Sequence, residues 1–171
     1  RPVKLATVTA SEWDACKHAV RWFENIGEPF DILVSLPATS PFRSVVDVEC
    51  CLSKLLKSSG ADAVIAVKEA ERSPYFNMVK LDANGYASLA SSGVSVQRRQ
   101  DAPKVFDITT VAYAVRTKFI MSSTGLFPSK LLTVTVPPER ALDIDTPYDF
   151  LLAELLVANK KVMGLSDDNS C

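Results

Sequence analysis

Apolar residues follow two alternating patterns along the first part of the chain. Residues 9–27 and 44–58 carry them three and four positions apart, which predicts two amphipathic helices. Residues 31–36 and 61–67 are short apolar runs, which predict buried strands. Because helix and strand alternate here, we expect a parallel sheet with helices packed on its faces.

The pattern changes after residue 70. Residues 77–89 are typical of a β-hairpin in which Asn84 and Gly85 supply the positive φ angles of the turn. Residues 90–106 are polar, basic and irregular, so they predict no regular element. Two further strands and a last helix are expected, at residues 109–115, at residues 131–136 and from Thr146 and Pro147 onward.

The composition is that of an ordinary globular protein, and we expect one domain over residues 1–171. Hydrophobic residues make up 47% and charged residues 23%, and the formal net charge is −1. The sequence has no basic stripe, so we do not expect nucleic-acid binding. No apolar run approaches the roughly 18 residues needed to span a bilayer. The four cysteines form no CxxC pair and cannot build a zinc site with the single His18. We therefore expect unpaired thiols in a cytoplasmic protein.

Asp143, Ile144 and Asp145 form the sharpest chemical feature of the sequence. They lie between a predicted strand and a predicted helix. In an extended segment, residues two apart point the same way, so both carboxylates can face one cation. Hard oxygen ligands suit Mg²⁺, which also holds triphosphate oxygens. The alternative is a solvated acidic turn in which Asp145 and Thr146 only start the helix.

Two loops carry further candidate residues. A polar loop contains Arg98 and Arg99, and guanidinium groups bind phosphate or carboxylate through two parallel hydrogen bonds. Residues 36–43 follow a strand end, where open α/β sheets bind ligands, and Thr39 and Ser40 offer hydroxyls there. Either loop could instead be plain protein surface.

Four motifs, in order along the chain, resemble those of one enzyme family. LPATSPFR resembles the family's LQPTSPLR, QRRQDAPKVF its RRQDLPKVY, and ALDIDTPYDF its SIDIDTEEDL. The first residues, with Arg1-Pro2, Leu5-Ala6 and Thr9-Ala10-Ser11, resemble its RPxxLAxDTAS. The family is that of the CMP-sialic acid synthetases, or acylneuraminate cytidylyltransferases. The match begins partway into the family chain and the first residue is not Met, so we expect the C-terminal two-thirds of such a protein, without its triphosphate-binding loop.

The resemblance implies a Rossmann-like three-layer α/β/α sandwich of the nucleotide-diphospho-sugar transferase type, with a mixed sheet. It implies transfer of CMP from CTP to N-acetylneuraminate or a related nine-carbon acidic sugar, with release of pyrophosphate and with Mg²⁺ as cofactor. The family is typically homodimeric, with a hairpin that crosses to the partner. Residues 71–106 are the expected dimerisation arm.

The resemblance also assigns roles to individual residues. Asp143 and Asp145 correspond to the Mg²⁺ ligands, and Arg99 to an arginine near the reacting phosphate and sugar. These three are the expected catalytic residues, and one of the aspartates is the best candidate for the general base. The expected nucleotide- and sugar-binding residues are Arg1, Ala10, Ser11, Thr39, Ser40, Thr109 and Tyr113.

Departures from the family pattern cluster on the sugar side. Pro37 replaces a glutamine, and Thr109 stands where the family has an asparagine. These changes suggest a different acidic sugar, such as a legionaminic-type one, or a weakened activity. Two alternatives stay open: a degenerate homologue that acts as a binding or regulatory protein, and a nucleotide-sugar glycosyltransferase, which also uses a DxD motif on a Rossmann-like sheet.

Overall fold

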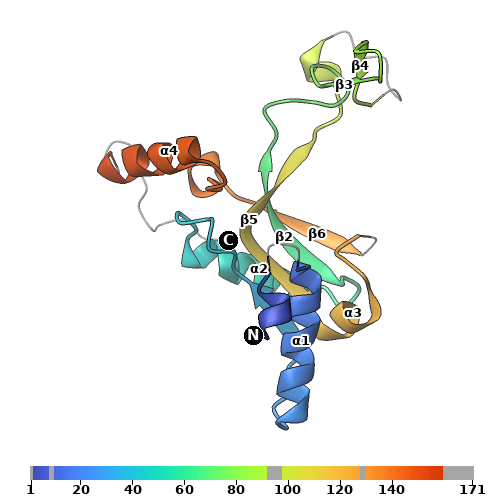
Figure 1. The fold of residues 1–171 in the computed structure, drawn as a ribbon, viewed down its shortest axis with the longest axis vertical. Helices are drawn as coiled ribbons and strands as arrows, with labels where there is room; N and C mark the ends of the chain where they lie inside the picture. Colours follow the sequence, from blue (N-terminus) through green and yellow to red (C-terminus); the bar gives the residue numbers. More distant parts are fainter. Residues whose placement is uncertain (1, 8–9, 92–97, 128–129, 160–171) are drawn as a thin grey trace.

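The computed structural model describes residues 2–7, 10–91, 98–127 and 130–159. Its centre is a four-stranded sheet in the order β1-β5-β2-β6 (Figure 1). β5 runs antiparallel to both of its neighbours, whereas β2 and β6 are parallel, so the sheet is mixed as expected. The strands are β1 (Ile32–Ser35), β2 (Ala63–Glu69), β5 (Phe106–Arg116) and β6 (Leu131–Thr135).

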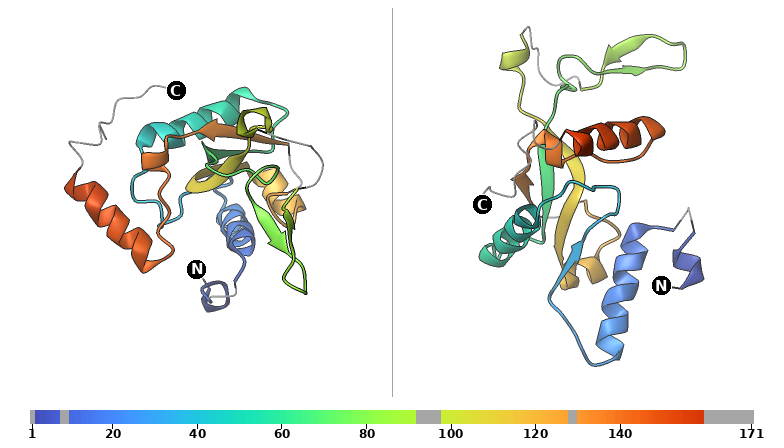
Figure 2. Two further views of the ribbon diagram at one scale, coloured as in Figure 1. Left: turned by 90° about the horizontal axis from the view of Figure 1, so that it is seen from above. Right: turned by 90° about the vertical axis from the view of Figure 1, so that its left-hand side faces the viewer.

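Helices cover both faces of this sheet, which gives the three layers predicted from the sequence (Figure 2). Alternate residues of a strand point to opposite faces, and the two cores follow that alternation. On one face, Val64 and Ala114 pack under α2 (Val45–Lys57). On the other, Ala63 and Val115 pack under α1 (Glu12–Asn25) and α3 (Thr117–Ser122).

The last helix, α4 (Pro147–Ala158), differs from the others in its packing. It begins as the sequence predicts, with Thr146 as N-cap and Pro147 in the first position, and Asp149 completes a capping box. Only Ala153 is buried along it. Figure 1 shows α4 standing apart from the three layers, which explains why its apolar side chains remain exposed.

Between β2 and β5 the chain leaves the main sheet and forms a separate projection (Figure 1, top). Its regular part is the two-stranded antiparallel sheet of β3 (Val79–Leu81) and β4 (Ala87–Leu89). Gly85 in the connecting turn has φ +86, as predicted, whereas Asn84 does not take a positive φ, so the prediction is wrong at that residue. The projection falls within residues 71–106, the expected arm.

Two smaller observations bear on the sequence-based expectations. None of the helices in the described part of the chain is long and apolar enough to cross a membrane. Cys16 and Cys51 are free thiols, and Cys51 is fully buried. Cys50, however, is disulfide-bonded, so the expectation of unpaired thiols is wrong at this residue.

Candidate functional site

Two loops from distant parts of the chain meet beside β5. The amide of Ile144 donates to the carbonyl oxygen of Thr39 at 2.9 Å. The hydroxyls of Ser40 and Thr110 are 2.6 Å apart, and the Ser40 hydroxyl also approaches the carbonyl oxygen of Leu142 at 3.5 Å. Ser40 is 2% exposed. The structure therefore brings the predicted residues Thr39 and Ser40 to the segment that carries the two aspartates.

Arg43 fixes the shape of the first of these loops. Its Nε donates to the carbonyl oxygen of Ser40 at 3.0 Å, and its Nη2 donates to that of Pro37. The guanidinium group thereby bridges two parts of a loop that belongs to no helix or strand. This arrangement holds Ser40 against Thr110 on the sheet.

Asp143 carries an unusual feature. Its Oδ1 atom is buried and has no hydrogen-bond partner in the described part of the chain. A buried carboxylate oxygen without a partner costs free energy, which a bound cation would recover. Asp145, two residues on, is exposed, while its own amide donates to Asp149 Oδ2 at 3.2 Å. This donor set fits a divalent cation.

The described residues contain no group of three or more His, Cys, Asp or Glu side chains that could hold a metal ion. A cation held by Asp143 and Asp145 would therefore complete its shell with water or with ligand oxygens. Mg²⁺ sites at phosphate-transferring centres have this form, because the ion keeps several waters and binds substrate phosphates.

Tyr113 lines a hollow of about 270 Å³ between α1 and the sheet. Most of its lining is apolar, with Trp13 and Leu33 among the side chains. Two polar groups also line it: Glu12 at the start of α1 and Ser35 at the end of β1, whose hydroxyl donates to Glu12 Oε1 at 2.9 Å. The hollow can therefore take an apolar group and offer its polar neighbour a carboxylate acceptor.

The electrostatics of Tyr113 connect this hollow to the aspartate segment. Burial raises the pKa of the Tyr113 phenol, and the negative charges of Glu12 and Asp143 raise it further. Tyr113 therefore lies within electrostatic range of Asp143 and stays protonated at neutral pH. Its hydroxyl can act there as a hydrogen-bond donor.

The remaining predicted binding residues differ in how they are placed. Ser11 caps α1, since its hydroxyl accepts from the amide of Trp13 at 3.2 Å, and the amide of Ala10 donates to Thr7. Thr109 is 3% exposed, and its hydroxyl donates to the carbonyl oxygen of Ala66 at 3.0 Å. The Thr109 hydroxyl therefore donates its hydrogen bond within the sheet. Arg1 lies outside the described residues.

Arg99 lies in the projection rather than beside Asp143 (Figure 1). It lines a hollow of about 430 Å³ with Arg72, Lys104 and Glu69. One guanidinium nitrogen donates to the carbonyl oxygen of Glu71. Arg98, by contrast, forms an exposed ion pair with Asp101 at 2.8 Å. The two predicted arginines therefore belong to the projection, and the aspartates belong to the main sheet.

Sequence reasoning missed three polar residues of this site: Glu12, Ser35 and Thr110. Ser35 ends a strand and Glu12 begins a helix, and both are common places for ligand-binding groups in α/β sheets. Thr110 adjoins the predicted Thr109. The strand pattern could have signalled Ser35, but nothing in the local sequence pairs it with Glu12.

No protein-family model matches this chain. Two curated proteins are similar in sequence. One is a post-translational flagellin modification protein B of Campylobacter coli, 27% identical over 165 residues, which cover 96% of this chain and 69% of that protein. The other is a CMP-N,N'-diacetyllegionaminic acid synthase of Campylobacter jejuni, 26% identical over 133 residues, which cover 78% of this chain and 55% of that protein.

A solved structure shares the fold. It is a 4-diphosphocytidyl-2C-methyl-D-erythritol synthase from Anaerococcus prevotii, with a TM-score of 0.52 and 15% identity, covering 80% of this chain and 64% of that one. At this identity the likeness concerns architecture alone. The two sequence relatives agree with the four motifs in their similarity to CMP-sialic-acid-synthetase-like proteins, and the solved structure agrees with the expected fold.

Proposed function

We propose that this protein transfers CMP from CTP to a nine-carbon acidic sugar and releases pyrophosphate. The observation that carries the proposal is the buried Oδ1 of Asp143, which lacks a hydrogen-bond partner among the described residues and lies where two loops meet beside the sheet. A cation bound there would offset the free energy that burial of this unpartnered oxygen costs. The relative that makes a CMP-linked acidic sugar supports the choice of reaction.

Asp143 and Asp145 would hold Mg²⁺ in this proposal. When bound, the ion would neutralise negative charge on the phosphate groups of CTP. The chain's own residues would position the reactants. The contact of Ser40 with Thr110 holds the first loop against β5, and the bond from Ile144 to Thr39 joins the two loops. Tyr113 would donate a hydrogen bond from the neighbouring hollow. Catalysis of this kind depends on position and electrostatics.

The hollow beside Tyr113 supports an acylamino sugar as the acceptor. An acyl methyl group suits its apolar lining, and the carboxylate of Glu12 can accept a hydrogen bond from the amide N–H. Pro37 stands where the family has a glutamine, so the loop after β1 lacks that polar side chain. Both N-acetylneuraminate and a diacetylated legionaminic-type sugar carry an N-acyl group, so the hollow suits either. The change at Pro37 is the reason that we favour the legionaminic-type sugar.

The cationic hollow in the projection supports a second contact with anionic substrate. Arg72, Arg99 and Lys104 gather there against one carboxylate, Glu69. Guanidinium groups bind phosphate or carboxylate bidentately. In the proposed homodimer, the projection would bring this hollow to the partner's aspartate segment, so that Arg99 of one chain would serve the site of the other.

The test is pyrophosphate release by the full-length protein from CTP and Mg²⁺, with N-acetylneuraminate, with N,N'-diacetyllegionaminate, and with no sugar. Release that requires both metal and sugar supports the proposal, and faster release with the diacetylated sugar supports the acyl site. If the folded protein stays silent with both sugars, the proposal is wrong and a binding homologue takes its place.

Asp143→Asn tests the metal-binding role within the same assay. The amide is a weaker ligand without charge, so turnover should fall on the order of 100-fold. Asp62→Asn is the matched control, because Asp62 lies just before β2 begins, where its carboxylate accepts a hydrogen bond from the amide of Lys130, away from the two loops of the site. Equal losses in both variants would contradict the assignment of Asp143.

A further inference from the structure

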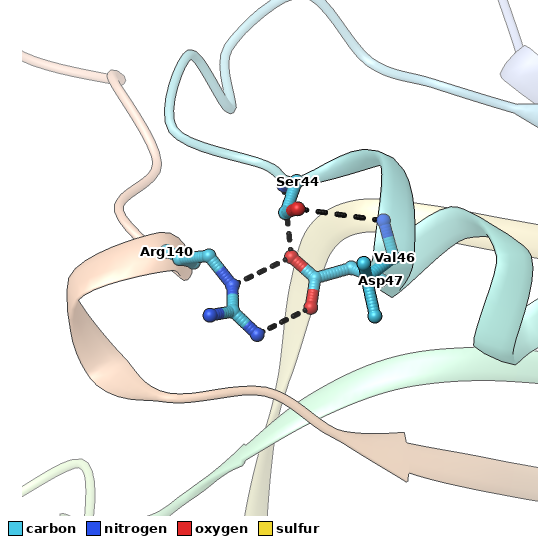
Figure 3. A network of polar contacts seen from close by, with 4 residues as sticks. All are labelled: Ser44, Val46, Asp47 and Arg140. Atoms are coloured by element: carbon cyan, nitrogen blue, oxygen red, sulfur yellow. Dashed lines mark hydrogen bonds and ion pairs between the residues drawn. The ribbon is translucent and has the colours of Figure 1, made fainter. Parts of the chain in front are cut away.

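An ion pair links the start of α2 to the segment just before the two aspartates (Figure 3). Arg140 Nε donates to Asp47 Oδ2 at 2.9 Å, and Arg140 Nη2 donates to Asp47 Oδ1 at 2.8 Å. The side chains of Arg140 and Asp47 are 15% and 3% exposed. The pair is therefore bidentate and largely removed from water, which makes it directional as well as strong.

Asp47 is held rigidly on its own side. Its Oδ2 accepts from the amide of Ser44 at 2.9 Å, which makes Asp47 part of the capping box of α2. Leu55 and Cys51 of the same helix are fully buried against the sheet. The carboxylate is thus an anchor fixed to the main core.

Arg140 belongs to a segment with little regular structure around it. It is the last residue of a single-turn 3₁₀ helix, Pro138–Arg140, in which the amide of Arg140 donates to Pro137 and that of Ala141 to Pro138. Residues 141–145 after it belong to no helix or strand. Asp143 follows Arg140 by three positions, so the position of the guanidinium group largely determines where the aspartate segment begins.

The aspartate segment has a second tie on its far side, through the bond from Ile144 to Thr39 and the contact of Ser40 with Leu142. The Leu142 contact, at 3.5 Å, is long. The ion pair is the charged and buried member of the set. It adds a charged hold on the near side of Asp143, next to Ala141, which is buried in the core.

We propose that Asp47 and Arg140 are positioning residues, which hold the Asp143 carboxylate in the orientation that binds the divalent cation. The proposal rests on the proposed function, because it takes Asp143 as a cation ligand. In this role the two residues act on Asp143 and not on the substrate. Their effect passes through the backbone of residues 140–143.

The test compares Mn²⁺ binding, followed by electron paramagnetic resonance, in variants of the full-length protein. Arg140→Lys keeps the charge but loses the two-pronged geometry, and we expect a several-fold weaker Mn²⁺ affinity with the fold retained. The double variant Asp47→Asn with Arg140→Met removes both charges, so no buried charge is left unpaired. We expect its affinity to fall on the order of 10-fold, as for partners that orient metal ligands.

Two controls make the outcomes distinguishable. Arg116→Met removes a partly buried arginine of β5. Its guanidinium group donates to the carbonyl oxygens of Leu55, Ser58 and Ala61, and so ties the other end of α2 to the sheet. It should lower thermal stability and leave Mn²⁺ affinity unchanged. Asp143→Asn should abolish the same Mn²⁺ binding.

If Asp143→Asn leaves Mn²⁺ binding intact, the metal site of the proposed function is wrong. If Asp143→Asn abolishes binding but the double variant binds Mn²⁺ as tightly as the unaltered protein, the positioning role is wrong. A drop in affinity that tracks melting temperature across all variants, Arg116→Met included, also overturns it, because the pair would then act only on stability.

Discussion

At the scale of single residues, Tyr113 reports the electrostatics of the site. Its phenol has a raised pKa because of burial first, and then because of the charges of Glu12 and Asp143. The neutral form is thus favoured in the folded protein. The resulting stabilisation is fully present below the pKa of an unfolded tyrosine, about 10, and is lost as the pH rises through the higher folded value.

This arrangement makes a prediction for the alkaline titration of the tyrosines. The difference in phenolate absorbance between the unaltered protein and Tyr113→Phe isolates the titration of Tyr113. We expect Glu12→Gln and Asp143→Asn each to lower the Tyr113 pKa, because each removes a negative charge that opposes ionisation. Asp14→Asn, on the same helical turn as Glu12, should leave it in place, and a shift in Asp14→Asn alone would contradict the geometry.

The residues of the site were only partly predictable. Asp143 and Asp145 stand out because two acids in an extended stretch form a local pattern. The partners of the site are not local: Asp47 and Arg140 are 93 residues apart, and Glu12 and Ser35 are 23 apart. Such pairs depend on how the helices and loops pack against the sheet. The sequence pattern therefore identified candidate ligands, and it could not identify the residues that hold them in place.

At the scale of elements, periodicity predicted most helices and strands but not all of their relations. An apolar run indicates a buried strand without indicating its direction. The resemblance implied a mixed sheet but did not say which strand runs antiparallel, and in the structure that strand is β5. The helix α3 has six residues, too few for a repeating apolar stripe. For α4, the start was predictable from its capping residues, whereas its exposure was not, because that depends on what it packs against.

The capping box of α4 predicts a local response to acid. The pKa of Asp149 is lowered, first by its hydrogen bond from the Thr146 hydroxyl and then by that from the Thr146 amide. The lowered value means that the cap contributes above the unfolded pKa and is lost as the pH falls through the folded one. Below about pH 4, the protection of the α4 amides against hydrogen exchange, relative to their intrinsic rates, should fall before that of the sheet.

Asp149→Asn provides the comparison for this acid response. The variant should show faster exchange in α4 already at neutral pH, and its acid step should be missing. An unchanged acid step in this variant would mean that another group controls the end of the helix. Exchange in β2 serves as the internal reference, because most of that strand is buried.

The hairpin turn allows a second prediction at this scale. Gly85 has φ +86, and no atom lies within 4 Å of the place that an alanine Cβ would take, so the substitution would meet backbone strain alone. We expect Gly85→Ala to destabilise the hairpin by about 1 kcal/mol, seen as faster amide exchange in β3 and β4. Gly60→Ala, equally uncrowded and without positive φ, should have little effect. The melting temperature of the main sheet should not change, because the hairpin forms a sheet of its own.

At the scale of the whole molecule, the projection carries large apolar side chains that are exposed in the single chain. Val79 and Leu81 are 61% and 68% exposed, and Tyr86 is 75% exposed. An isolated two-stranded hairpin is marginally stable in water, so exposed apolar residues on it suggest that another surface covers them. The proposed homodimer supplies that surface, and it would also bring the cationic hollow of the arm to a second chain.

Sedimentation velocity can decide whether the arm forms the dimer. Val79→Thr with Leu81→Thr keeps strand-forming side chains but removes much of the apolar contact, so we expect the dimer to dissociate to monomers. Lys80→Gln lies between them and points to the opposite face of the strand, so it should remain dimeric. If the arm carries Arg99 to the partner, the monomeric variant should also lose pyrophosphate release while keeping Mn²⁺ bound at Asp143. A dimer that survives the double substitution would place the interface elsewhere, and an unaltered protein that sediments as a monomer would require Arg99 to act within its own chain or not at all.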